Sequence, residues 1–176
     1  MKTNDPVRYT RTAMALHWLL ALAILGAFAL GLYVADLSPS PERLQFITWH
    51  KWAGITILAL SGLRLLWRLT HRPPTLPDSL PVWQTLAAHV NHAVLYVCMV
   101  AMPVSGFLGS SFTAYPIKFF GTPLPRLWEA SADFKEVFSA MHTAFSYAFM
   151  LTIAIHILAA LWHALRRDGI AKRMLR

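Results

Sequence analysis

Residues 138–167 read FSAMHTAFSYAFMLTIAIHILAALWHALRR, an apolar run that carries three histidines, His142, His156 and His163. The hydrocarbon core of a bilayer is about 30 Å thick, so roughly 20 helical residues cross it. This run is long and apolar enough to do so. Ionisable side chains are rare at membrane depth and usually functional there. The stretch therefore predicts a membrane-spanning helix whose histidines have a functional role, such as binding a ligand.

Further apolar runs lie at residues 13–35, 46–69 and 86–110, and the fourth span occupies residues 138–165. The composition agrees, since 56% of the residues are hydrophobic and the mean hydropathy is +0.46. The first run is too long for the apolar core of a secretion signal, so we interpret it as a retained span. The chain is predicted to be all-α: one membrane domain over residues 1–176, built as an up-down-up-down four-helix bundle.

The connections between the spans differ in character. Residues 70–83 contain four prolines, which end helices on both sides. Residues 111–137 form the longest connection, and their aromatic residues and prolines predict a folded segment on the membrane face. Cys98 is the only cysteine, so an intrachain disulfide is excluded.

The net charge of +8 falls on one end of the predicted bundle, the end with both termini and residues 70–83, while the opposite end is neutral. Lys and Arg accumulate in cytoplasmic loops, so both termini are predicted in the cytoplasm, where the basic tail suits anionic lipid headgroups. Since topology accounts for the basic residues, no nucleic-acid partner is predicted. The charged residues assigned to the cytoplasmic end are Lys2, Asp5, Arg8, Arg11, Arg64, Arg68, Arg72, Asp78, Arg166, Arg167, Asp168, Lys172, Arg173 and Arg176.

Helical geometry sorts four of the histidines by depth. His142 and His156 are 14 residues apart, so they point only about 40° apart and lie about 21 Å apart along the axis. His50 begins the second span at its outer end, and His17 begins the first span at its inner end. Depth therefore pairs His50 with His142 and His17 with His156. Two histidines from two helices at one level suit the axial ligation of a haem iron.

Small residues and one arginine fit such cofactors. Gly31 and Gly106 lie 14 residues after His17 and His92, and Gly54 lies four residues after His50, where glycine allows a porphyrin to approach the backbone. Arg64 lies 14 residues after His50 and is expected at the inner level. It could pair with a haem propionate, or its side chain could extend to the inner headgroups.

Three histidines keep open roles. His89 and His92 lie one helical turn apart at the inner end of the third span, and His163 follows His156 by seven residues. One of the first two could replace His17 or His156 as a ligand. All three could instead contact a quinone or relay its protons, or simply bond to headgroups and water. His71, in the proline-rich connection, is expected to be solvated.

Other chemistry finds little support. The chain has no CxxC, CxxCH or HExxH motif, which argues against covalent haem attachment and a zincin site. A transporter of divalent metals that uses the histidines as ligands is an alternative from another class. It would need ligands close together, and about 21 Å between His142 and His156 is too far for one ion.

These motifs together resemble the bacterial cytochrome b561 family over nearly the whole chain. The matching stretches are ALHWLLALAI (15–24), WHKWAGITILALSGLRLLWRLTHRPP (49–74), AAHVNHAVLYVCMVAMPVSGFLGSS (87–111), FGTPLP (120–125) and MHTAFSYAFMLTIAIHILAALWHAL (141–165). The resemblance implies a multi-pass protein of the bacterial inner membrane with two non-covalent haems b. It also implies the axial pairs His17–His156 and His50–His142.

One type in this family is similar to a superoxide oxidase, which passes electrons from superoxide at the periplasmic face to ubiquinone. For such a reaction Lys51 is predicted to act in catalysis, with Lys118, Arg126 and Lys135 helping to steer an anion towards the outer haem. This type carries a second histidine where this chain has Ala164. Related haem subunits of hydrogenases and formate dehydrogenases make relay to a partner dehydrogenase the alternative. A homodimer stays open.

Overall fold

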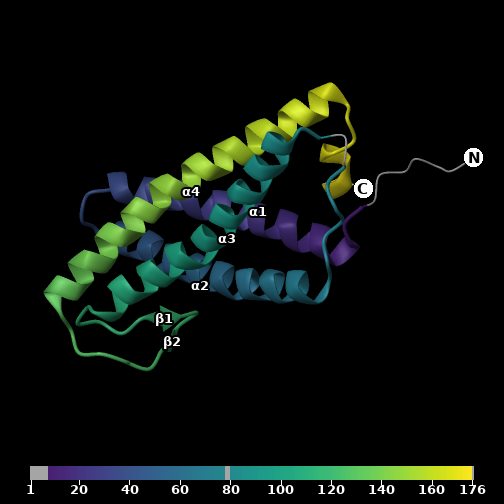
Figure 1. The fold of residues 1–176 in the computed structure, drawn as a ribbon. Coiled ribbons are helices and arrows are strands. Elements are labelled where there is room, and N and C mark those ends of the chain that lie inside the picture. The colour runs from purple at the N-terminus through teal and green to yellow at the C-terminus, as the bar shows by residue number, and fades with distance from the viewer. Residues whose placement is uncertain (1–7, 78–79, 176) are drawn as a thin grey trace, which may run out of the picture.

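Four long helices make up most of the chain in the computed structural model, which describes residues 8–77 and 80–175 (Figure 1). They are α1 (Arg11–Asp36), α2 (Pro41–Thr70), α3 (Val82–Ser111) and α4 (Ala132–Arg166). All four are long and apolar enough to cross a membrane, so the predicted all-α membrane bundle is confirmed. Of the charges used to predict topology, Lys2, Asp5, Asp78 and Arg176 lie outside the described residues.

Each helix extends beyond the predicted apolar span. The hydroxyl groups of Thr10, Ser40 and Ser131 accept hydrogen bonds from backbone N–H groups in the first turns of α1, α2 and α4. Pro41 opens α2, where its missing N–H costs nothing. These capping signals lie in polar sequence. The helices therefore begin before the residues become apolar.

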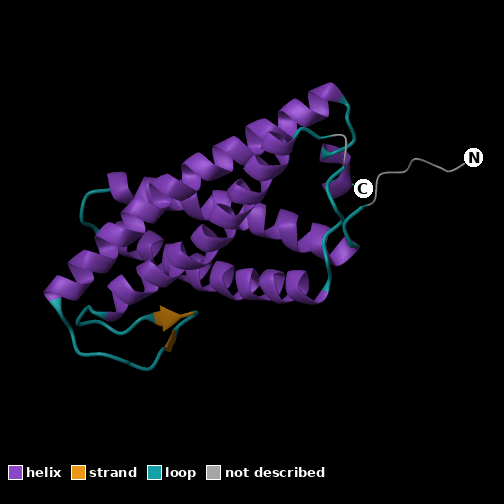
Figure 2. Cartoon of the chain, in the orientation of Figure 1, coloured by secondary structure: helices purple, strands orange, loops and turns teal. Residues whose placement is uncertain are grey.

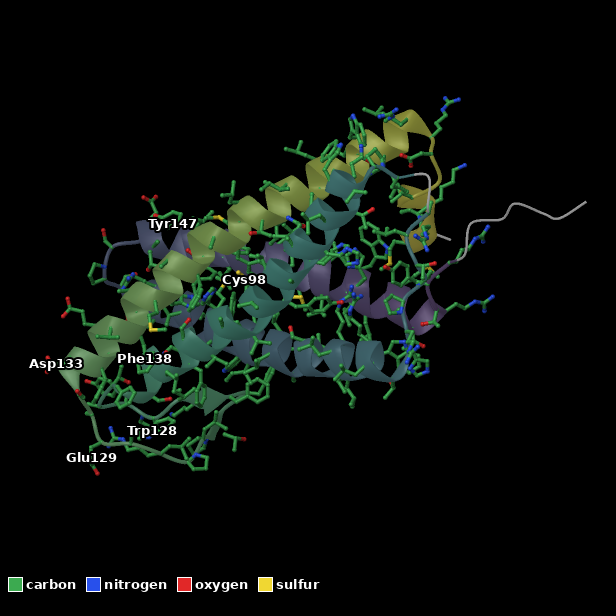
Figure 3. The ribbon with its side chains drawn as sticks, in the orientation of Figure 1. Cys98, Trp128, Glu129, Asp133, Phe138 and Tyr147 are labelled. Carbon is green, nitrogen blue, oxygen red and sulfur yellow. The ribbon has the colours of Figure 1, made fainter. Side chains whose placement is uncertain are left out.

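Consecutive helices are neighbours: α1 packs on α2, α2 on α3, and α3 on α4. The connections in Figure 2 run between these neighbours, and the one between α3 and α4 is the longest. A small core lies between them, and Cys98 marks its place near the middle of the bundle in Figure 3. Most other large apolar side chains face outwards, such as Leu22 at 70% exposure and Leu158 at 65%. This inverted distribution suits a bundle surrounded by lipid. The buried core residues are Leu20, Ile24, Ile57, Cys98, Met99 and Phe149.

One end of the bundle, which we call the hairpin end, is covered by the connection between α3 and α4. Strands β1 (Lys118–Phe119) and β2 (Thr122–Pro123) pair antiparallel through a turn in which Phe120 and Gly121 have positive φ. The indole Nε1 of Trp52 donates to the Lys118 carbonyl over 2.8 Å, and its ring stacks on Phe120. This connection is therefore folded, as its composition predicted, and it packs on α2.

The opposite end, which we call the terminal end, holds the beginning of α1 and the last described residues of the chain (Figure 1). A short 3-10 helix, η1 (Ala171–Met174), folds back against it. Trp18 donates its indole N–H to the Met174 carbonyl, and the Tyr9 backbone N–H donates to the Arg173 carbonyl. The buried Arg173 guanidinium donates to the Thr75 carbonyl at 2.7 Å. These bonds join the two termini to the proline-rich connection.

The hairpin depends on Trp52, and Trp52→Phe should loosen it. The substitution keeps an aromatic ring on Phe120 but removes the bond to Lys118, which is worth about 1 kcal/mol. We expect limited tryptic cleavage at Lys118 to be about fivefold faster, because opening becomes more frequent. Trp49→Phe, on the same helix and without a bond to the hairpin, is the control. Equal cleavage rates in both variants would contradict this role.

Candidate functional site: two pairs of histidines

The first pair joins α2 to α4 near the hairpin end. The rings of His50 and His142 face each other with centroids 6.1 Å apart and planes at 86°. His142 Nδ1 lies 2.8 Å from the Met102 carbonyl on α3, with the Ser105 hydroxyl at 3.5 Å. That carbonyl can only accept, so Nδ1 carries the proton and Nε2 is left with its lone pair. His142 is thus oriented as a metal ligand.

Two glycines make room for these rings. A Cβ on Gly106 would lie 2.9 Å from the His142 ring, and a Cβ on Gly31 would lie 3.0 Å from His50 Cε1. The sequence assigned both glycines to the approach of a porphyrin; in the structure the imidazoles fill the space beside them. His50 lies beside the backbone of Ala27, four residues before Gly31. Its buried Nδ1 makes no hydrogen bond of standard geometry within the described part of the chain.

The second group lies nearer the terminal end. His17 on α1 and His156 on α4 have centroids 6.1 Å apart, the same separation as the first pair. His92 on α3 also approaches His156, with centroids 5.4 Å apart. His156 therefore has two histidine neighbours at this level. The position of His92 is compatible with either role left open by the sequence, that of a ligand or that of a contact to a quinone.

The ring separations fit a metal held between two imidazoles. An imidazole nitrogen binds a metal at about 2.0–2.1 Å and the ring centre lies about 1.1 Å behind it, so two rings sharing one ion have centres about 6 Å apart. The pairs His50–His142 and His17–His156 both match at 6.1 Å. Within residues 8–77 and 80–175, no group of three or more His, Cys, Asp or Glu could hold a metal on its own. Two axial ligands need the remaining positions filled by a macrocycle, as in haem.

Arg64 lies beside the second group. Its Nη1 donates to the Ala13 carbonyl at 3.2 Å, one helical turn before His17, and its guanidinium approaches the Tyr96 ring. The side chain is half-buried rather than extended into solvent. Gly54, the other glycine that the sequence placed at a cofactor, has open space where its Cβ would be among the described residues.

The other histidines lie away from the facing rings. His89 is exposed and bonds to the Thr85 carbonyl of its own helix. His71 stacks on Trp67 at the end of α2. His163 Nδ1 lies 2.6 Å from an Asp168 carboxylate oxygen, a contact between α4 and the segment after it. Partial burial raises the pKa of Asp168, but hydrogen bonds from His163 and the Ile170 N–H outweigh this, so the pKa lies below its ordinary value.

The sequence did not single out Asp168 as a partner of His163. The contact depends on the end of α4, where Arg167 adopts a left-handed conformation with φ of 55° and Gly169 follows with φ of 87°. This reversal brings the carboxylate back to the helix. A glycine three residues beyond the last residue of a helix with a basic end is a capping signal that could have predicted the turn.

Several basic residues belong to the hairpin end, where acidic residues balance their charge. Lys51 is half-buried directly beside His50, and the hairpin holding Lys118 packs on Trp52. Arg126 donates to the Thr113 carbonyl, and Lys135 is exposed in the first turn of α4. Among the described residues the one ion-pair contact is His163–Asp168, at the terminal end. No carboxylate of the described residues therefore forms a direct ion pair with Lys51, Lys118, Arg126 or Lys135.

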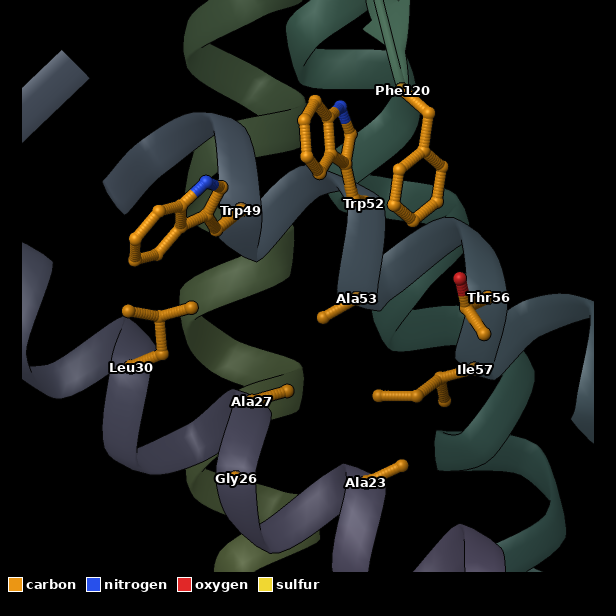
Figure 4. Close-up of a pocket in the computed structure, with 10 residues that line it drawn as sticks. All are labelled: Ala23, Gly26, Ala27, Leu30, Trp49, Trp52, Ala53, Thr56, Ile57 and Phe120. Atoms are coloured by element: carbon orange, nitrogen blue, oxygen red, sulfur yellow. The ribbon is translucent and has the colours of Figure 1, made fainter. Parts of the chain in front are cut away.

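An apolar groove of about 330 Å³ runs between α1 and α2, close to His50 (Figure 4). Trp49, Trp52 and Phe120 line its upper part in the figure, and Ala23 and Gly26 lie opposite on α1. The indole N–H of Trp52 is already bonded to Lys118. The groove therefore suits hydrocarbon rather than a polar ligand.

Gly106→Ala should destabilise the protein. The added methyl would meet the His142 ring at 2.9 Å, and overpacking of this kind costs about 1–3 kcal/mol. We expect a lower thermal unfolding midpoint in detergent. Gly62→Ala is the control, because a Cβ there meets nothing within 4 Å among the described residues. Its midpoint should stay equal or rise, since alanine favours helix over glycine. Equal midpoints in both variants would contradict the close packing at Gly106.

Comparisons with known proteins agree with the fold. The family model for prokaryotic cytochrome b561 matches residues 8–176. Cytochrome b561 homolog 2 of Escherichia coli (strain K12) is 34% identical, over 98% of this chain and 94% of its own length. A probable superoxide oxidase (CybB) of Yersinia pestis is 29% identical, over 96% of each chain. Cytochrome b561 homolog 1 of Escherichia coli (strain K12) is 25% identical, over 96% of this chain and 97% of its own. The chain belongs to the prokaryotic cytochrome b561 family of multi-pass membrane proteins that bind haem b and transfer electrons.

Proposed function

We propose that this protein holds two haems b and carries electrons across the membrane between a donor at the hairpin end and a quinone at the terminal end. The observation that carries the proposal is the repetition of one arrangement, two imidazoles from different helices with centroids 6.1 Å apart, at two levels of the bundle. His50 and His142 are the proposed ligands of one haem, and His17 and His156 those of the other. Haem supplies reversible one-electron chemistry at its iron.

The protein's part is to orient the ligands and exclude water. The Met102 carbonyl fixes the tautomer of His142, which leaves the lone pair on Nε2, and the His142 ring faces His50. Phe149 packs edge-to-face against Phe28 in the apolar core along α4 between His142 and His156. Arg64 is the proposed partner of a propionate, supported by its half-buried position one helical turn from His17.

We place the hairpin end in the periplasm and both termini in the cytoplasm of a bacterial inner membrane. The excess of Lys and Arg at the terminal end supports this orientation. Superoxide is the proposed donor, supported by the relative named as a probable superoxide oxidase and by the half-buried Lys51 directly beside His50. Two superoxide ions would each give one electron and leave as O₂. One quinone would take both electrons and two protons to become the quinol.

The quinone site is proposed at the terminal end. His163, with its proton held by Asp168, and His92 beside His156 supply groups that can bond to a carbonyl oxygen and deliver a proton. His89 would serve as a relay from the surface, where it is exposed.

A second candidate is relay for a partner dehydrogenase. Exposed aromatic residues on the hairpin connection favour it, with Tyr115 at 82% and Phe120 at 67% exposure. Such residues are common at docking surfaces. Superoxide-dependent quinone reduction by the purified chain alone would separate the two candidates, since a relay subunit would be inactive without its partner.

A histidine series tests the ligand assignment. His50→Ala and His142→Ala should each remove one haem of two, and His17→Ala and His156→Ala should each remove the other, because a six-coordinate iron loses a ligand it needs. The measurement is the haem-to-protein ratio with the redox titration of the haem that remains. His89→Ala is the control and should keep both haems. If His92→Ala loses a haem while His17→Ala keeps both, the second pair is His92–His156.

Lys51→Gln tests the donor. Removing a charge beside the donor's approach should lower the second-order rate with superoxide by about fivefold at low ionic strength, and the difference should shrink as salt screens the charge. Pulse radiolysis of the haem-loaded protein measures this rate. Lys172→Gln, at the terminal end, should leave it unchanged. Equal rates for the Lys51→Gln variant and the wild type at low salt would contradict a steering role.

A further inference from the structure

A second cavity, distinct from the facing histidines, opens at the terminal end between α1, α2 and the proline-rich connection. Its volume is about 160 Å³. Four of the described residues that line it are arginines and none is acidic. The arginines are Arg8, Arg64, Arg68 and Arg72.

Two of the positive charges in this cavity share a neighbour. The guanidinium carbons of Arg64 and Arg68 lie 5.9 Å and 5.1 Å from the centre of the same ring, that of Tyr96. Like charges brought together repel unless an anion joins them. Among residues 8–77 and 80–175 the ion-pair contact is His163–Asp168, which lies outside this lining. No carboxylate of the described chain therefore balances the cluster through a direct contact.

The walls of the cavity are held in place before anything binds. Trp67 donates its indole N–H to the Thr10 hydroxyl at 3.1 Å, joining α2 to the start of α1. His71 stacks on Trp67 with centroids 3.8 Å apart and planes at 5°, and its Nδ1 lies 2.9 Å from the Thr70 hydroxyl. A site with fixed walls loses little freedom on binding.

The volume of the cavity and its position along α2 limit which ligands it can bind. A water molecule takes about 30 Å³ in the liquid, so the cavity equals about five waters, enough for a phosphate group with part of a glycerol. Arg68 lies in the last turn of α2 and Arg72 just beyond it. This level is where the headgroups of the surrounding leaflet lie when the helix crosses the membrane. Ala13 and Leu16 continue the lining towards the apolar part of α1.

We infer that this cavity binds the phosphate of an anionic phospholipid, with Arg68 and Arg72 as its main ligands and Arg8 beside them. Guanidinium groups bind phosphate oxygens in pairs of parallel hydrogen bonds. The cytoplasmic leaflet is the anionic one, and basic pockets between membrane helices recognise its headgroups. The inference rests on the proposed orientation, with the terminal end in the cytoplasm, but on neither the donor nor the quinone.

The test compares two double variants of the full-length, haem-loaded protein in neutral detergent. Arg68→Gln/Arg72→Gln removes two charges from the cavity. Arg166→Gln/Arg167→Gln removes two charges from the end of α4, where Arg166 packs on Trp162 outside the cavity. Phosphatidylglycerol and phosphatidylcholine are titrated in mixed micelles, and bound lipid is counted by native mass spectrometry. Inorganic phosphate is the third ligand tested, and its binding is measured by the shift in the thermal unfolding midpoint of the protein.

We expect the wild type to retain one phosphatidylglycerol at least tenfold more tightly than phosphatidylcholine. The cavity variant should lose this preference, and the α4 variant should stay within twofold of the wild type. Both variants should keep the haem content of the wild type. If the cavity double variant does not fold, the single variants Arg72→Gln and Arg167→Gln are compared instead. Arg72 is exposed, so its substitution should not disturb folding.

Three outcomes would overturn the inference. Equal losses in the two double variants would mean a diffuse cationic surface rather than a site. Stabilisation by inorganic phosphate equal to that by phosphatidylglycerol would mean a site for free anions. Loss of one haem from the cavity variant with lipid binding unchanged would mean that these arginines hold a propionate.

Discussion

The structure depends on how an imidazole is accommodated at membrane depth. Each ring nitrogen there needs a partner, because hydrocarbon offers none. His142 meets this with one nitrogen near the Met102 carbonyl and its ring facing His50. The glycines at 31 and 106 follow from the same need, since any side chain there would meet the rings. Helix packing in this bundle is thus arranged around the histidines rather than around a large apolar core.

Much of this could be predicted from the sequence. Apolar runs gave the four helices, and the 14-residue spacing of His142 and His156 gave two levels on one helix, so the facing partners could be named. Helix ends could not be predicted from hydropathy: α4 begins at Ala132 because Ser131 caps it, six residues before the predicted span. Gly31 and Gly106 were predicted to let a porphyrin approach, and the structure places a histidine ring beside each of them, which periodicity could not predict because it gives the face of a helix but not which side chain packs there. The glycine after α4 could have predicted a left-handed turn there, but only the three-dimensional structure shows that this turn brings Asp168 to His163.

The two ends of the bundle are built for different surroundings. At the hairpin end, Trp52 and Phe120 fix a short hairpin over α2, close to the His50–His142 pair. At the terminal end, the termini and the proline-rich connection are joined by backbone and indole hydrogen bonds around four arginines. An aromatic cover at one end and a basic one at the other accord with a protein that meets a donor on one side and anionic lipid and quinone on the other.

Two haems b in one chain, one for each histidine pair, are what the repeated arrangement of rings leads us to expect. They are measured most directly by the reduced-minus-oxidised visible spectrum of the purified protein, with haem and protein quantified on the same sample. We expect sharp b-type bands at two haems per chain. One haem per chain would contradict the two-level arrangement. A colourless protein after haem supplementation during expression would contradict haem binding altogether.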